Sequence, residues 1–386
     1  MARLEEICSL ITDGSHFSPE DEGVGYPMFS VKDMTPNGFN ISGCKKIGEE
    51  AYKKLVANGC KPLNDDVVVA KDGSYLKTAF VIKGNPEIAL LSSIAILRPK
   101  IDLVVPEYLS YFLKSDAVYR TVSLNYITGT ALKRIILKGI RKIEVDLPDI
   151  GEQEQRAQRL SKVDYLCQLR KQQLDKLDEL VKARFVEMFG DPVNNPMNYP
   201  KSQLGKVCDV RDGTHDSPEY YDVGYPLVTS KNVTGGKIDL SECNLISEDD
   251  YKKTCERSKV DRGDIIMPMI GTVGKPVIVN IEPMFAIKNV ALIKFTPDSL
   301  VTNIYIKTLL ESDYFDRAVL DKIRGGTQKF IALGDIRKLE IILPDLKHQQ
   351  CFSAFVERVD KQKQTVQQSL EKLKLMKKAL MQEYFG

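Results

Sequence analysis

The chain has 386 residues, and 43% of them are hydrophobic. This content is enough for real cores and argues against global disorder, while the length favours two or three domains. The 55 basic and 53 acidic residues leave a formal net charge of +2. The chain is therefore not a bulk polycation, but DNA binding stays open because the local placement of Lys and Arg matters more than their total.

Targeting segments and metal motifs are not evident from the sequence. Residues 1–6 lack the basic stretch leading into an apolar one that a signal peptide has. The longest apolar stretch, 88–97, is broken by Ser92 and Ser93 and is too short to span a bilayer. The eight cysteines include no Cys-x-x-Cys pair, and the three histidines do not cluster with them, so neither a disulfide framework nor a zinc site is expected. We predict a cytoplasmic protein with no metal and no membrane partner.

An internal repeat divides the chain into two parts of similar size. The Asp-Gly-Ser-His segment at 13–16 returns as Asp-Gly-Thr-His at 212–215, and Lys32 returns as Lys231. The other repeated segments are Gly-Tyr-Pro at 25–27 and 224–226, Tyr-Lys-Lys at 52–54 and 251–253, and Leu-Pro-Asp at 147–149 and 343–345. A period of about 200 residues is far too long for a solenoid and is the size of a domain.

Each repeat begins with a globular half, at 1–148 and at 198–344. Short apolar runs such as 67–69 and 265–267 follow tight-turn residues and predict short strands, and helical stretches such as 106–115 lie between them. This mixture favours an α+β domain with a mixed or antiparallel sheet over a regular βαβ alternation.

The second part of each repeat, at 152–190 and 348–386, has no proline and no internal glycine. Its apolar residues recur at three–four spacing, which is a heptad seam. The predicted coiled-coil seam consists of Leu160, Val163, Leu174, Leu177 and Val181 in the first helix and Val356, Val359, Val366, Leu370, Leu373 and Leu380 in the second. An antiparallel pair of such helices, each roughly 58 Å long at 1.5 Å per residue, would hold the globular halves apart. Two unpaired, solvated helices are the alternative.

Basic residues interrupt each seam where the other repeat has an apolar residue. They are Arg170 and Arg184 in the first helix and Lys363 and Lys377 in the second. Because polar seam residues set register and partner choice, we expect the two helices to prefer each other over self-pairing.

The chain order then predicts four segments. A first globular domain occupies 1–150, and the first long helix occupies 151–190. The segment 191–345 contains a linker followed by the second globular domain, and the second long helix occupies 346–386. The linker begins with a turn-rich stretch of three prolines and three asparagines at 191–200.

A catalytic motif is not recognisable in the sequence. Residues 271–275 resemble the end of a phosphate-binding P-loop, but the four-residue spacing is missing and Pro276 stands in place of Ser or Thr. The Asn/Asp-Pro-Pro-Tyr/Phe loop of an amino-methyltransferase is also missing. The Pro-Asp pairs at 148–149 and 344–345 lack the spaced Glu-x-Lys of a nuclease and are better explained as turns that start a helix. We expect no enzymatic activity and no bound cofactor, and an enzyme with an unrecognised site remains an alternative.

The repeated Asp-Gly-Ser/Thr-His segments allow two interpretations. In the first they are structural loops, in which Asp13 and Asp212 cap nearby amides and Gly14 and Gly213 take a positive φ. In the second, the same loops also contact DNA.

The order of these motifs, their duplication, and the long helix after each globular half resemble the specificity subunit of a type I restriction–modification enzyme over essentially the whole chain. The resemblance implies that each globular half is a target-recognition domain for one part of a bipartite DNA sequence. It implies that the helices form an antiparallel coiled coil that sets the spacing and docks two methyltransferase subunits, which use S-adenosylmethionine to methylate adenine. Restriction–translocase subunits join that core, and the subunit itself is non-catalytic. Because the two halves here are unusually alike, related half-targets are expected.

Base recognition uses polar side chains that project from loops, while phosphate contacts hold the register on the duplex. The candidate DNA-binding residues are Ser15, His16, Lys32, Lys71, Ser74, Lys77, Lys133 and Arg134 in the first half, and Thr214, His215, Lys231, Asn232, Thr272, Lys275, Gln328 and Lys329 in the second. An ordinary solvated surface residue is the alternative for each of them. For the whole chain, the alternative from another class is a coiled-coil scaffold that organises protein partners without binding nucleic acid.

Overall fold

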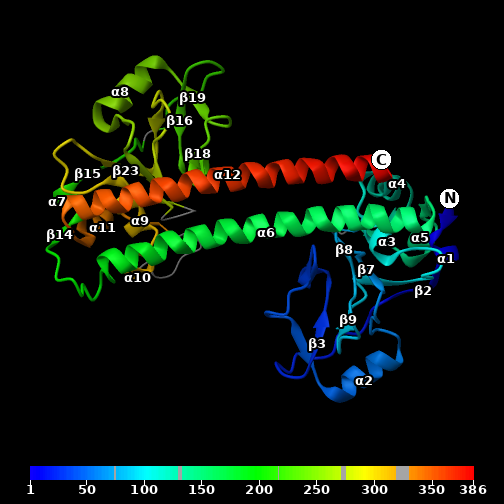
Figure 1. Cartoon of the computed structure of the whole chain (residues 1–386). Helices are drawn as coiled ribbons and strands as arrows, with labels where there is room; N and C mark the ends of the chain where they lie inside the picture. The colour runs from blue at the N-terminus through cyan, green and yellow to red at the C-terminus, as the bar shows by residue number, and fades with distance from the viewer. Residues whose placement is uncertain (74, 129–132, 216, 271–274, 319–329) are drawn as a thin grey trace. The chain divides into compact units, whose positions relative to one another are not determined.

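The computed structural model describes residues 1–386 except 74, 129–132, 216, 271–274 and 319–329. The chain forms two compact units. Unit 1 consists of Met1–Lys171 and Gln368–Gly386, and unit 2 consists of Gln172–Gln367. Each unit therefore combines one globular domain with a part of both long helices, α6 (Ile150–Phe189) and α12 (Leu346–Phe385) (Figure 1).

The main sheet of unit 1 has four antiparallel strands. Their order is β2 (Cys8–Asp13), β10 (Ile94–Pro99), β7 (Val67–Ala70) and β8 (Ala79–Val81). The central strand β7 is apolar throughout because it is buried on both faces. Val67 and Val69 belong to the core shared with α3 (Pro106–Leu113) and the long helices, whereas Val68 belongs to a second core on the opposite face.

A smaller mixed sheet lies in the distal part of the same domain (Figure 1). Its order is β6 (Lys45–Ile47), β3 (Tyr26–Phe29) and β9 (Ala89–Leu90), with β3 antiparallel to β6 and parallel to β9. The other elements of unit 1 are β1 (Ala2–Arg3), α1 (Leu4–Ile7), η1 (Val31–Asp33), β4 (Met34–Thr35), β5 (Gly38–Phe39), α2 (Glu49–Ala57), α4 (Asp116–Asn125), β11 (Ile127–Thr128), β12 (Arg134–Ile135), α5 (Leu137–Arg141) and β13 (Glu144–Val145).

Unit 2 repeats this plan. Its four-stranded antiparallel sheet has the order β15 (Asp209–Asp212), β23 (Val290–Lys294), β20 (Ile265–Pro268) and β21 (Val277–Ile278), and its mixed sheet has the order β19 (Asn244–Ile246), β16 (Tyr225–Val228) and β22 (Ala286–Ile287). The other elements are β14 (Lys201–Gln203), α7 (Leu204–Val207), η2 (Ser230–Asn232), β17 (Val233–Thr234), β18 (Lys237–Ile238), α8 (Glu248–Ser258), α9 (Asn303–Leu310), α10 (Asp313–Ala318), α11 (Leu333–Lys338) and β24 (Glu340–Ile342). The prediction of two similar α+β domains with antiparallel and mixed sheets is confirmed.

Two of the repeated motifs stabilise the distal parts of the domains. The tyrosine of Gly-Tyr-Pro stacks on the tyrosine of Tyr-Lys-Lys in both units. The ring centres of Tyr26 and Tyr52 are 4.0 Å apart, and those of Tyr225 and Tyr251 are 4.2 Å apart. Aromatic stacking of this kind adds to the area that the rings bury, so these repeated residues maintain the fold.

The Leu-Pro-Asp motif starts each long helix, as predicted. Asp149 Oδ1 accepts a hydrogen bond from the backbone N–H of Glu152 at 2.9 Å, and Asp345 Oδ1 accepts one from His348 at 2.9 Å. An aspartate at this position satisfies one of the free N–H groups of the first helical turn. The buried Gln153 then ties the helix to the domain, because its side chain donates to the carbonyl of Pro148 at 2.9 Å.

Within each unit the two long helices pair antiparallel. In unit 1, Lys377 donates to Asp164 at 2.6 Å and Arg170 donates to Ser369 at 3.2 Å. In unit 2, Lys363 contacts Asp178 at 2.5 Å. Three of the four basic residues that interrupt the heptads thus bind polar groups of the opposite helix, which fits a role in register. The fourth, Arg184, pairs with Glu187 of its own helix at 2.8 Å. The structure buries Leu160, Val163, Val356, Val359, Val366 and Leu370, and it partly buries Leu174, Leu177, Val181, Leu373 and Leu380.

The end of each long helix completes the core of a domain. In unit 1, Phe385 packs edge-on against Tyr108, with ring centres 5.2 Å apart. In unit 2, the fully buried Phe189 packs against Tyr305 and Phe352 with ring centres 5.1 Å and 5.4 Å away. The first domain therefore depends on the end of α12, and the second depends on the end of α6.

Candidate DNA-binding loops

Several loops of unit 1 meet at one edge of its main sheet. Strands β2 and β7 both run antiparallel to β10, so their carboxyl-terminal ends lie at the same edge. Ser93 joins η1 to this edge, because its hydroxyl accepts from the N–H of Val31 at 3.0 Å and its carbonyl accepts from that of Lys71 at 2.9 Å. The carbonyl of Lys133 accepts from the N–H of Gly73 at 2.9 Å. Residues 13–16, 31–33, 71–73, 75–78 and 133–135 are named the first loop edge.

Unit 2 forms the corresponding edge with the same backbone pattern. The N–H of Thr214 donates to the carbonyl of Ile287 at 3.0 Å, and the N–H of Ile331 donates to that of Met269 at 2.9 Å. Residues 212–215, 230–232, 269–270, 275, 287–289 and 330–331 are named the second loop edge.

The repeated Asp-Gly motif needs a glycine because there is no room for a side chain at this position. A Cβ on Gly14 would lie 2.1 Å from the carbonyl oxygen of Leu90, and one on Gly213 would lie 2.3 Å from that of Ile287. Neither glycine has a positive φ, so the predicted left-handed conformation is wrong. Two backbones approach so closely here that no side chain fits.

In the first loop edge a lysine compensates the charge of Asp13. The Lys71 ammonium contacts Asp13 Oδ2, and the two side chains are only 9% and 12% exposed. Nε2 of His16 lies 3.6 Å from the same oxygen, on a side chain that is 80% exposed. The carboxylate therefore pairs with a buried cation, whereas the sequence pattern predicted that it caps amides.

In the second loop edge a different set of groups surrounds the carboxylate. His215 Nε2 donates to Asp212 Oδ2 at 2.8 Å, and the Arg257 guanidinium from α8 contacts Oδ1. Nδ1 of His215 lies 3.0 Å from Oδ1 of Asn289. Burial alone would raise the pKa of Asp212, but the hydrogen bonds from His215 and Arg257 bring it below its usual value.

The same contacts favour a charged imidazole. The bond to Asp212, and then the one to Asn289, raise the pKa of His215. An imidazole that donates from both nitrogens is the imidazolium form. The second loop edge thus presents a histidine whose contacts favour the charged form, on a side chain that is 60% exposed.

The predicted residues of the first half divide into an exposed and a buried group. His16, Lys32, Lys77, Lys133 and Arg134 are exposed on the first loop edge. Lys71 and Ser15 are buried. The Ser15 hydroxyl donates to the carbonyl of Phe17 at 2.6 Å, so it shapes the loop. Ser74 lies outside the described residues.

The second half shows the same division. His215, Lys231 and Lys275 are exposed, and Thr214 is partly buried. Asn232 is buried, and its Oδ1 accepts from the N–H of Thr229 at 3.0 Å in the turn before η2. Thr272, Gln328 and Lys329 lie outside the described residues.

The two loop edges differ in chemistry at one matched position. In unit 1, the backbones of Asp72 and Arg134 form an isolated β-bridge, and the two side chains form an ion pair at 3.3 Å. In unit 2 the matched bridge joins Ile270 and Phe330, and Phe330 is 51% exposed. An exposed aromatic ring suits the methyl group of thymine, whereas an arginine suits guanine.

Sequence reasoning missed Asn289 and Phe330 of the second loop edge, and also Arg257 of α8, which contacts Asp212. Arg257 lies far from the motif in sequence, and only the fold brings it to Asp212. One signal was present, because Met269 stands where the first half has Lys71. The second aspartate thus lacks the lysine that the first one uses, and its cation has to come from another element.

Clustered metal ligands and membrane-spanning helices are both missing from the described part of the chain. There, no group of three or more His, Cys, Asp or Glu side chains could hold a metal ion, and no helix is long and apolar enough to cross a membrane. The eight cysteines are free, and burial raises the pKa of the matched thiols Cys8 and Cys208 to about 12. These two cysteines act as small core residues.

Two similar domains, each with a loop edge of the same plan and each packed on both long helices, define a class of protein with two similar modules. The family described as type I restriction modification DNA specificity domain matches this chain twice, at residues 1–179 and 196–375. The chain belongs to this family.

Individual relatives agree with this assignment. The type I restriction enzyme MjaVIII specificity subunit of Methanocaldococcus jannaschii is 24% identical, with 85% of this chain and 79% of that protein covered. The type I restriction enzyme EcoKI specificity subunit of Escherichia coli is 20% identical, with 77% and 68% covered. The crystal structure of a type I restriction–modification system S subunit from M. genitalium shares the fold with a TM-score of 0.57 at 14% identity, covering 100% of this chain and 95% of that one.

Proposed function

We propose that this chain is the non-catalytic DNA-recognition subunit of a type I restriction–modification complex, in which each loop edge reads one half of a bipartite duplex target. The observation that carries the proposal is the duplicated loop edge. The same backbone frame appears in both units, but it presents Asp72 and Arg134 in one and Ile270 and Phe330 in the other. A constant frame with different exposed side chains is what two readers of two different half-sites require.

The exposed residues supply both kinds of contact that specific binding needs. Lysines such as Lys32, Lys133 and Lys231 project into solvent, where they can neutralise phosphates. Arg134 and Phe330 offer groups that can contact base edges. The buried Ser15, Lys71 and Asn232 hold the loops in place.

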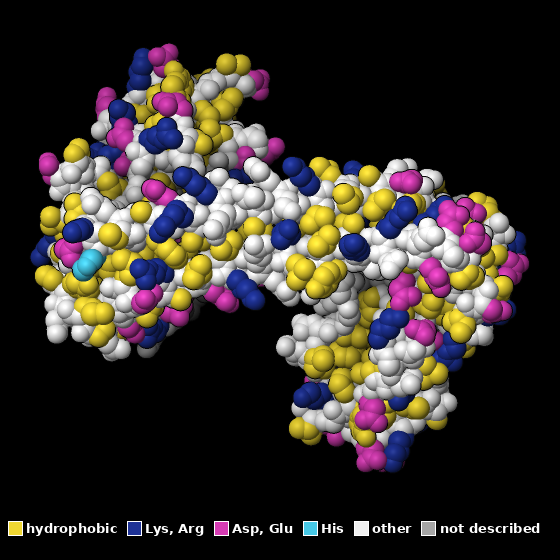
Figure 2. Space-filling view, in the orientation of Figure 1, with side chains coloured by type: hydrophobic (Ala, Val, Ile, Leu, Met, Phe, Trp, Pro, Cys, Tyr) yellow, Lys and Arg dark blue, Asp and Glu magenta, His cyan; other side chains and the backbone are white. Residues whose placement is uncertain are grey.

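The same proposal assigns partner docking to the helix pair. Apolar side chains lie on the exposed surface of the helices (Figure 2). In unit 1, Tyr165 and Met376 are 60% and 53% exposed, and Leu375 is 68% exposed. Exposed apolar groups on a helix suit packing against partner helices. We assign this surface to two methyltransferase subunits, which bind S-adenosylmethionine, with restriction–translocase subunits joining the complex.

Selection from a random duplex library tests the proposal. The full chain, together with its methyltransferase subunits, is expected to enrich a target of two short specific parts separated by unread positions. Arg134→Ala should relax positions in one part only, and Phe330→Ala in the other. Enrichment of no sequence by the folded complex would leave the protein-scaffold alternative instead. Label transfer from S-adenosylmethionine to DNA by the chain alone would contradict the non-catalytic assignment.

A further inference from the structure

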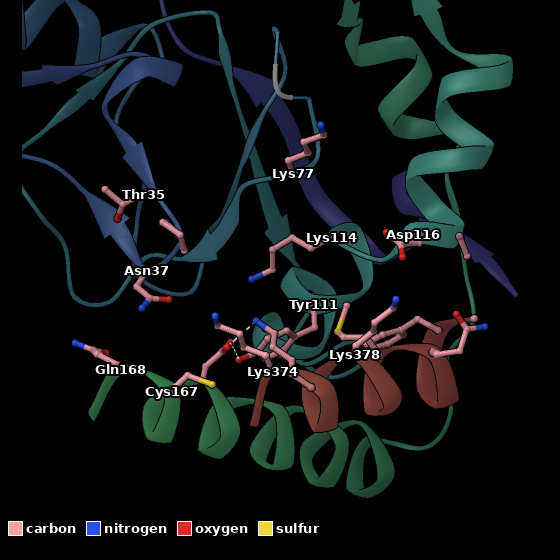
Figure 3. Close-up of a pocket in the computed structure, with 18 of the residues that line it drawn as sticks. Thr35, Asn37, Lys77, Tyr111, Lys114, Asp116, Cys167, Gln168, Lys374 and Lys378 are labelled. Carbon is pink, nitrogen blue, oxygen red and sulfur yellow. Dashed lines mark hydrogen bonds and ion pairs between the residues drawn. The ribbon is translucent and has the colours of Figure 1, made fainter. Parts of the chain in front are cut away.

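A cavity of about 670 Å³ opens in unit 1 between the globular domain and the helix pair (Figure 3). Its lining contains the lysines Lys77, Lys114, Lys171, Lys374, Lys377 and Lys378 and the two carboxylates Asp116 and Asp164. Lys377 binds Asp164 at 2.6 Å, and Lys374 binds Glu371 at 2.8 Å. The other four lysines have no ion pair among the described residues. The lining therefore carries a net positive charge.

Lys114 is the lining lysine that is most in need of a counter-ion. Its ammonium lies 4.6 Å from the ring centre of Tyr111, and its side chain points into the space between the domain and the helices (Figure 3). Burial, and next the charge of Lys377, lower the pKa of Lys114 to about 8, against an opposing effect of Asp164. A cation in such a place is stabilised by an incoming anion.

The lysines of the lining are repeated only in part, because Lys275 and Lys182 of unit 2 match Lys77 and Lys378. In unit 2, Glu311 stands where unit 1 has Lys114, and Asp178 stands where unit 1 has Lys374. Asp178 binds Lys363 at 2.5 Å across the helix pair. Two cations of unit 1 are thus anions in unit 2, so the positive charge of the cavity lining is not repeated at the matched described positions of unit 2.

The cavity adjoins the first loop edge. Lys77 belongs to both, and the β4–β5 hairpin that follows η1 contributes Thr35 and Asn37 to the lining (Figure 3). The Thr35 hydroxyl donates to the carbonyl of Gly38 at 2.9 Å, but an amide group such as that of Asn37, beside ammonium groups, is a typical donor to phosphate oxygens. A duplex bound at the first loop edge therefore has these donors next to its backbone.

We propose that this cavity, named the lysine cavity, binds phosphate groups of the DNA backbone beside the first half-site. The proposal rests on the proposed function and adds that the two halves hold DNA unequally. Unit 1 contacts the backbone through its domain and its helices together, and unit 2 lacks this second contact. Ammonium groups attract phosphates without reading bases, so the lysine cavity sets affinity and leaves the recognised sequence unchanged.

The test uses the full chain in complex with its methyltransferase subunits and two duplexes of equal length, one with the selected target and one without it. Lys171, Lys374 and Lys378 are exposed helix residues, so the triple variant K171Q/K374Q/K378Q should keep the fold. The dependence of log K on log[salt] should become shallower by about 0.9 for each phosphate that the variant no longer neutralises. Affinity should fall by the same factor for both duplexes. The matched control K162Q/K176Q/K372Q removes three exposed helix lysines outside the cavity and should change neither quantity.

The possible outcomes separate the two proposals. An unchanged salt slope in the folded triple variant, with normal binding by the parent chain, would contradict the lysine cavity and leave the proposed function intact. Failure of the parent complex to bind either duplex would contradict the proposed function itself. If inorganic phosphate raised the Tm of the parent but not of the triple variant, while the DNA slope stayed the same, the cavity would be a small-anion site and the assignment to DNA would be wrong.

Lys114→Met supplies a second readout that a merely structural role would not show. It removes a partly buried cation whose charged form is disfavoured, so Tm should hold or rise while affinity for both duplexes falls. A fall in Tm with unchanged affinity would contradict the proposal, because it would make Lys114 a packing residue.

Discussion

The two loop edges share a buried aspartate but neutralise it in different ways. Asp13 pairs with Lys71, which comes from the end of a neighbouring strand. Asp212 has Met269 at that place and pairs instead with His215 and with Arg257 from α8. The glycine after the aspartate is required in both units, because the backbones approach too closely for a side chain. The compensating cation can come from any element that reaches the carboxylate, which leaves the surrounding surface free to diverge.

Separating the two repeats should have the largest effect on the stability of the fold. A fragment of residues 1–190 keeps the first domain but loses Phe385, which fills its core beside Tyr108. It also exposes Phe189, which corresponds to Phe385 and normally fills the second domain. We expect the fragment to fold only as a dimer, in which the α6 end of each copy completes the core of the other. Light scattering after size-exclusion chromatography measures this state.

Phe189→Ala in the same fragment is the control. Truncating a buried phenylalanine typically costs about 3–5 kcal/mol, so this variant should lose both the dimer and its folded state. A folded, stable monomer of residues 1–190 would show that the helix ends are dispensable and would contradict the core assignment.

Replacing Lys71 by methionine, the residue at the matched position 269, tests directly how the two loop edges neutralise their aspartates. Lys71→Met leaves the buried Asp13 without its cation, and removal of one partner of a buried pair typically costs about 3–5 kcal/mol. Arg257→Ala should cost less, because Arg257 is 62% exposed and His215 still binds Asp212. Calorimetric Tm values of the two variants check this order. The exposed Lys32→Met is the control, and equal losses in the two variants would mean that Lys71 has no special role.

The arrangement of domains and long helices could be predicted from the sequence, because strand patterns, turn residues and heptads depend on residues close together in the chain. The two domains, the helix pair and the helix starts at Asp149 and Asp345 are of this kind. The chemistry of the loop edges could be predicted only in part. Burial of Lys71 and Asn232, and the approach of Arg257 to Asp212, result from contacts between distant segments that no local pattern encodes.

The glycine of the Asp-Gly motif shows the same limit. Local turn chemistry suggested a positive φ at Gly14, which is the common reason for a glycine in a loop. The actual reason is the carbonyl of Leu90, which lies too close for any Cβ. A close approach between distant backbones leaves no signature near the glycine in sequence.

Exchanging the matched bridge residues should alter specificity rather than stability. Phe330→Arg places in the second loop edge the group that Arg134 offers in the first. The change should shift base preference at one or two positions of the second half-site, at a cost of about 1–3 kcal/mol for the original target. Selection from a duplex library reads the result. Phe17→Arg, an exposed aromatic residue of unit 1 outside the bridge, is the control. An unchanged target would remove Phe330 from the set of base contacts.

The smallest expected effect is a pH dependence of the second loop edge. Because its contacts raise the pKa of His215 above the usual value near 6.5, protonation stabilises the folded loop fully below about pH 6.5, and this contribution is lost as the pH rises through the raised pKa. The imidazolium also adds one positive charge to the surface to which we assign DNA binding, so DNA affinity should fall over the same pH range. The loss should correspond to about one unit in the salt slope, as for a single phosphate contact. Fluorescence anisotropy at a series of pH values measures it, with His215→Gln expected to remove the dependence and His16→Gln to retain it. A pH profile that survives in His215→Gln would mean that another group titrates, and that the contacts to Asp212 and Asn289 only position the loop.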